Sequence, residues 1–100
     1  MSSASAIALT GVNAASLRMD VAAHNVANVQ TAHFRRQQVS QAAEAALGGV
    51  KTTLSFSAAE GDALANDLVQ HKAASYEYIA NLKVIKTQDQ MTGFLLDMRA

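Results

Sequence analysis

Residues 69–98, VQHKAASYEYIANLKVIKTQDQMTGFLLDM, contain the longest periodic pattern in this chain of 100 residues. Apolar residues recur in them at spacings of three and four, which is the repeat of one face of an α-helix. Gly61 and Asp62 mark the expected start, with Asp62 as the N-cap. A helix over 62–99 would be about 57 Å long. Its apolar stripe comprises Val69, Ala73, Tyr76, Ala80, Val84, Thr87, Met91, Leu95 and Met98.

The N-terminal part of the chain has a second and narrower pattern. Its apolar positions alternate between spacings of four and three, as in a heptad repeat. Alanine occupies three of the seven positions, which lets another helix approach closely. We expect a helix that frays near residues 30–34. The seam consists of Ala8, Val12, Ala15, Met19, Ala22, Val26 and Val29.

The connecting segment differs from the two helical segments in composition and in residue periodicity. Residues 37–47 are rich in Gln, Ala and Glu and are compatible with a short helix, which Gly48-Gly49 would end. Residues 50–56, VKTTLSF, alternate and are rich in β-branched side chains, which predicts a short strand. The natural partner of that strand is the extended stretch around 34–39. Because a lone two-stranded hairpin is marginal in water, such a flap needs the helices or a neighbouring molecule beside it.

Composition agrees with a helical chain. There is no Pro to interrupt helices and no Cys, and 21 of the apolar residues are Ala, which favours helix but buries little area. We therefore expect a mainly α fold in which two long amphipathic helices form an antiparallel coiled-coil-like hairpin. The expected parts are an N-terminal helix over 1–33, a short connecting segment with a possible β-hairpin over 34–61, and a C-terminal helix over 62–100. The helices should need partners to cover their apolar faces.

The patterns that carry chemistry are missing. Gly48-Gly49 lacks the Lys-Ser/Thr of a phosphate loop, and the formal net charge of +0 argues against a nucleic-acid binder, with Arg35-Arg36 the single basic pair. No apolar run approaches the roughly 18 residues that span a bilayer, and residues 1–16 lack the basic region of a signal peptide. We expect no enzyme, cofactor, metal or small-molecule substrate. The titratable residues are expected on solvated surfaces, namely His24, His33, His71, Asp67, Glu77 and Asp89.

Both ends of the chain resemble the flagellar axial proteins, the family of rod, hook and hook-associated subunits. Residues 17–35, LRMDVAAHNVANVQTAHFR, are similar to the N-terminal signature of that family, and residues 67–96 are similar to its C-terminal segment. The family usually has a small or turn-forming residue before Phe34, where this chain has Ala32-His33. The N-terminal matches are Met19, Asp20, Val21, Asn25, Val26, Ala27, Asn28, Thr31 and Phe34. The C-terminal matches are Leu68, Val69, Ala74, Tyr78, Asn81, Lys83, Val84, Ile85, Thr87, Asp89, Met91, Gly93, Leu95 and Leu96.

The resemblance implies a structural role in the bacterial flagellum. Family members leave the cell through the flagellar type III export apparatus without a cleaved signal, and they assemble helically into a hollow tube with paired terminal helices inside. Larger members carry β-rich domains between the two segments, so this chain resembles a minimal rod-type member. The implied location is the basal body, in the rod or proximal hook, and the implied partners are copies of itself and other axial proteins.

Two sets of residues admit alternatives. Asn25 and Asn28 either end the first helix by bonding to its backbone or bond across to an adjacent subunit and fix its register. Tyr78 and Asn81 share a helix face and serve either core packing or subunit contact.

A cytoplasmic helical-hairpin adaptor that binds a partner helix is the alternative function. The predicted packing and subunit-interface residues are Ala8, Val12, Ala15, Met19, Ala22, Asn25, Val26, Asn28, Phe34, Val69, Tyr78, Asn81, Val84, Met91 and Leu95.

Overall fold

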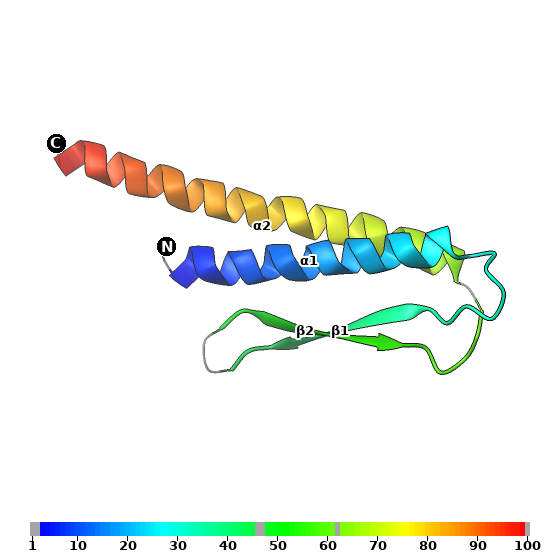
Figure 1. The fold of residues 1–100 in the computed structure, drawn as a ribbon. Helices are drawn as coiled ribbons and strands as arrows, with labels where there is room; N and C mark the ends of the chain where they lie inside the picture. Colours follow the sequence, from blue (N-terminus) through cyan, green and yellow to red (C-terminus); the bar gives the residue numbers. More distant parts are fainter. Residues whose placement is uncertain (1–2, 46–47, 62, 100) are drawn as a thin grey trace.

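Two antiparallel helices make up most of the molecule (Figure 1). The computed structural model describes residues 3–45, 48–61 and 63–99. Helix α1 spans Ser3–Ala27 and helix α2 spans Leu64–Arg99. The first residues of α1 and the last residues of α2 lie at the same end of the molecule. The expectation of a mainly α helical hairpin is confirmed.

The connecting segment forms a β-hairpin that lies along α1. Strand β1 (Gln37–Ala43) pairs antiparallel with strand β2 (Val50–Phe56). Gly48 and Gly49 at the turn have positive φ angles of 74° and 92°, which glycine adopts without steric cost. Helix α1 contacts α2 on one side and both strands on the other, so α1 is the middle layer (Figure 1). The alternative of a helix over 37–47 is wrong for 37–43, because pairing with β2 outweighs the helix propensity of its Gln and Ala residues.

Helix α1 ends at Ala27, a little earlier than predicted. The Nδ2 group of Asn28 donates to the carbonyl of His24 at 2.8 Å, and turns follow. His33 then adopts a positive φ of 59°. This left-handed conformation is uncommon for a residue with a side chain, although histidine enters it more readily than most. The position before Phe34 thus has the geometry of a turn-forming residue although the residue is histidine.

Helix α2 is much longer than its partner. It has 36 residues against 25 and continues through Gly93 without a break. The predicted N-cap, Asp62, lies outside the described residues. Since Gly11 of α1 faces Asn81 of α2, and the helices run antiparallel, α1 begins opposite residue 89. The remaining ten residues of α2 correspond to about 15 Å of helix. This end of α2 projects beyond α1 (Figure 1).

The molecule is elongated and its core is thin. Its extents are 63 × 26 × 13 Å, and its radius of gyration is 17.4 Å, against about 13 Å for a compact chain of this length. The apolar side chains that are buried in the described part of the chain are all small. They are Ala8, Val12, Ala14, Ala15, Val21, Ala22 and Ala74.

Candidate assembly surface

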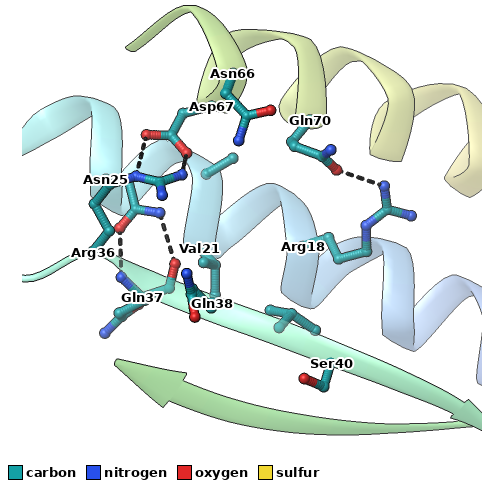
Figure 2. Close-up of a pocket in the computed structure, with 12 residues that line it drawn as sticks. Arg18, Val21, Asn25, Arg36, Gln37, Gln38, Ser40, Asn66, Asp67 and Gln70 are labelled. Atoms are coloured by element: carbon teal, nitrogen blue, oxygen red, sulfur yellow. Dashed lines mark hydrogen bonds and ion pairs between the residues drawn. The ribbon is translucent and has the colours of Figure 1, made fainter. Parts of the chain in front are cut away.

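A junction of polar side chains holds the start of the hairpin to α1 (Figure 2). The Nδ2 group of Asn25 donates to the carbonyl of Gln37 at 2.9 Å, and the backbone N–H of Gln37 donates to Oδ1 of Asn25 at 2.9 Å. One buried amide therefore satisfies both backbone groups of Gln37, as a neighbouring strand would. Asn25 is 3% exposed, so it bonds within its own chain and neither sequence alternative describes it.

The same junction joins the hairpin to α2 through an ion pair. The Nε group of Arg36 donates to Oδ2 of Asp67 at 3.1 Å, and its Nη2 group bonds to Oδ1 of the same carboxylate. The Asp67 side chain is only 4% exposed. The expectation that Asp67 lies on a solvated helix face is wrong, because the start of β1 brings a guanidinium over it. Sequence spacing gave no signal for this pair, since 31 residues separate its members.

A third contact of the junction lies further along the helix pair. Arg18 of α1 bonds to the carboxylate of Glu77 and, at 3.0 Å, to Oε1 of Gln70, both on α2. Together with Asn25, Arg36 and their partners, Arg18 lines a cleft of about 350 Å³ between α1, β1 and α2 (Figure 2).

The polar side chains of the cleft bond to one another and hold the elements together. Its cationic side chains bond to carboxylates and amides that also line it or lie beside it. Within the described part of the chain, no buried side-chain nitrogen or oxygen lacks a hydrogen-bond partner. The bonds in this cleft fix the relative placement of three elements.

The face of α2 that meets α1 combines small and polar residues with the half-buried Tyr78 and Ile85. Ala74 is fully buried, and Asn81 lies so close to α1 that a Cβ atom on Gly11 would be 2.7 Å from its Oδ1 atom. In the hairpin predicted from the sequence, the alanine seam would face the broad apolar side of the C-terminal helix. This is wrong for the stripe of α2, whose large side chains stay exposed. Helices that approach closely need small residues at the contact, and the stripe carries large ones. Ala73 of the stripe precedes Ala74 by one residue, so the stripe lies about 100° around the helix from the buried face.

This leaves the apolar stripe of α2 on the surface along its whole length. Val69 is 64% exposed, and Leu95 is 60% exposed. Where α2 projects beyond α1, Phe94 and Leu96 add further apolar area. We call this surface the outer stripe. Its exposed large side chains are Val69, Tyr76, Val84, Met91, Leu95 and Met98.

The predicted interface residues differ in burial between the two helices. On α1 the seam is largely covered within the chain, with Ala8, Val12, Ala15, Ala22 and Asn25 buried and Met19 and Val26 half-buried. Phe34 is half-buried, with its ring 5.5 Å from that of His24. Asn28 is half-buried and bonds to the backbone of α1, as the first alternative describes. On α2, Tyr78 and Asn81 are half-buried, while Val69, Val84, Met91 and Leu95 are exposed.

Tyr78 and Asn81 lie one turn apart on α2. The Nδ2 group of Asn81 donates to the carbonyl of Glu77 at 2.9 Å, and the Asn81 amide lies against Gly11 of α1. Asn81 thus packs between the helices. Both side chains are half-buried, as packing within the chain predicts.

Among the residues that the structure describes, no group of three or more His, Cys, Asp or Glu is arranged to hold a metal ion. No helix in the described part of the chain is long and apolar enough to cross a membrane.

Comparison with known proteins adds no assignment. No protein-family model matches this chain, and no curated protein matches it.

Proposed function

We propose that this chain is a structural subunit of the bacterial flagellar rod or proximal hook, which assembles helically through its terminal helices. The proposal rests on the sequence resemblance at both ends and on the outer stripe of α2. That stripe is the observation that carries it, because apolar helix surface of this extent needs a neighbour in water.

The exposed area supports the need for neighbours. The molecule exposes 6934 Å², whereas a compact monomer of 10.5 kDa exposes about 5,400 Å² by size scaling. The excess of about 1,500 Å² is comparable with the total area buried in a standard protein interface. A chain with this excess gains much of its burial only on assembly.

The energy available from the outer stripe is large for a chain of this size. Fully burying a large apolar side chain is worth about 1.5–3 kcal/mol. Six such side chains on the stripe are roughly half or more exposed, so covering them offers about 5–12 kcal/mol per copy before ordering costs. This is similar to the total stability of a small domain, which is about 5–15 kcal/mol. Folding and polymerisation are therefore coupled in the proposed subunit.

A pair of charge variants tests the proposal. Val84→Asp places a carboxylate on the outer stripe, whereas Gln90→Asp adds the same charge to an exposed position on another face of α2. We expect Val84→Asp to abolish incorporation into the hook–basal body and motility, because burial of an unpaired charge is costly. Gln90→Asp should retain both. Normal assembly of the Val84→Asp protein would refute a role for the stripe.

Export provides the second part of the test. The proposed subunit should reach the basal body fraction only in cells with an intact flagellar export apparatus. A cytoplasmic helical-hairpin adaptor would instead stay inside the cell in both strains and bind a partner helix. Retention of the chain in the cytoplasm of export-competent cells would therefore overturn the flagellar proposal and favour the adaptor.

A further inference from the structure

The outer edge of β2 carries backbone groups with no partner in the described part of the chain. The Ser57 N–H donates to the Arg36 carbonyl, and the Glu44 N–H donates to the Gly49 carbonyl. Along an antiparallel ladder, hydrogen-bonded pairs alternate with non-hydrogen-bonded pairs, and Ser57 and Gly49 belong to hydrogen-bonded pairs. The backbone N–H and C=O groups of Thr52, Leu54 and Phe56 therefore point away from β1.

Helix α1 holds the outward backbone groups at the first residue of each strand. The Val50 N–H donates to Oγ1 of Thr10 at 3.1 Å, and Gln37 bonds to Asn25. The free part of the β2 edge is therefore residues 52–56. In Figure 1 the C-terminal end of β2, marked by its arrowhead, lies on the side of the hairpin away from α1.

This edge lacks the features that protect the edges of natural sheets. Strand β2 has no Pro, and its single charge is Lys51, outside the free part. Leu54 and Phe56 are 47% and 58% exposed. A sheet of two strands is also marginal, and further strands stabilise it.

We propose that β2 of a second copy of this chain pairs antiparallel with this edge, with the two-fold axis at Leu54. The result is a closed dimer with a four-stranded sheet in the order β1–β2–β2–β1. Leu54 then faces Leu54 of the second copy, Thr52 faces Phe56, and Thr53 faces Ser55. Such β-branched–aromatic and Thr–Ser pairs are favourable across strands.

One detail favours this register over the shift that would bring Phe56 of the second copy opposite Val50. Val50 takes no part in the pairing, so its bond to Thr10 survives. The contact is isologous and closes on itself, as most homodimer contacts do. It uses the hairpin and not the outer stripe, so it does not depend on the proposed function.

Single cysteines test the register directly, because the chain contains none of its own. In a hydrogen-bonded antiparallel pair the Cα atoms lie about 5.5 Å apart, which suits a disulfide. Leu54→Cys should therefore form a disulfide-linked dimer under mild oxidation. Thr53→Cys and Ser55→Cys, at neighbouring exposed positions, should not, since each lies diagonally from its copy at about 7–8 Å or more.

The expected result is dimer formation by Leu54→Cys at a rate well above that of both control variants. Equal rates for the three variants, or no dimer from Leu54→Cys, would overturn the proposal. Pairing of β2 with β1 of another copy would give a disulfide only between Leu54→Cys and a cysteine on β1, and would overturn it as well.

A proline pair gives a second measurement without oxidation. Leu54→Pro removes an N–H that points outward, which an edge strand tolerates, so the hairpin should persist while the dimer is lost in sedimentation equilibrium. Thr53→Pro removes an N–H of the β1–β2 ladder and should disrupt the hairpin itself. Unchanged dimerisation of the Leu54→Pro protein with a folded hairpin would overturn the proposal.

Discussion

Replacement of Arg36 by methionine should destabilise the chain more than any change at its exposed neighbour Arg35. The substitution removes both bonds to Asp67 and leaves a carboxylate that is 4% exposed beside an apolar side chain. Removing one member of a buried pair costs about 3–5 kcal/mol. We take about 3 kcal/mol, the lower limit, because Arg36 itself is 17% exposed.

The size of this loss makes it easy to measure. A chain of 100 residues has about 5–15 kcal/mol of stability in total, and 3 kcal/mol corresponds to a fall in Tm of about 12–24 °C. The assay is urea and thermal unfolding of dilute protein, followed by circular dichroism. Arg35→Met is the control. Arg35 is exposed, and its Nε group donates to the Ser57 carbonyl, so its loss should cost no more than about 1 kcal/mol.

A double variant decides whether the uncompensated charge is the cause. Arg36→Met with Asp67→Leu removes both charges, so it should be more stable than Arg36→Met alone. Equal midpoints for Arg36→Met and Arg35→Met would refute the role of the pair. If the losses in unfolding free energy from the two single changes simply add in the double variant, Asp67 and Arg36 do not interact energetically.

Three further changes test the packing of α1. Gly11→Ala should lower stability by about 1 kcal/mol in thermal unfolding, because the new Cβ atom meets the Asn81 amide. Gly93→Ala should leave the unfolding midpoint unchanged, since Gly93 lies in the projecting end of α2 and a Cβ atom there meets nothing within 4 Å. Equal effects of the two changes would contradict the close approach of the helices. Asn25→Ala should cost about 2 kcal/mol and speed amide hydrogen exchange at Gln37, whose backbone groups lose both partners; unchanged exchange would show that the amide does not hold β1.

The helices and the covered face of α1 could be predicted from the sequence. In α1 the seam coincides with alanines, and the same residues that define the period also permit close approach. Ala8, Ala15 and Ala22 are buried accordingly. Strand β2 was predicted from its β-branched residues, whereas its predicted partner, the stretch around 34–39, overlaps β1 only at 37–39. These features depend on local sequence.

The inner face of α2 could not be predicted in this way. Its strongest periodicity belongs to large apolar residues, but periodicity shows that a face is apolar without showing what covers it. The face that meets α1 instead has Ala74 and Asn81, which are weak hydrophobic signals. The Arg36–Asp67 pair was missed because it depends on where the hairpin crosses α2, and no pattern of local spacing contains that information.

The projecting end of α2 has a consequence for spectroscopy of the dilute chain. Beyond residue 89 the helix has only its own backbone bonds and residue propensities to maintain it, and it contains Gly93. Such a segment frays from its tip on a submicrosecond to microsecond timescale, independently of the paired region. Ellipticity should therefore drift with rising temperature well before the cooperative transition, and truncation at residue 89 should flatten that drift without moving the midpoint.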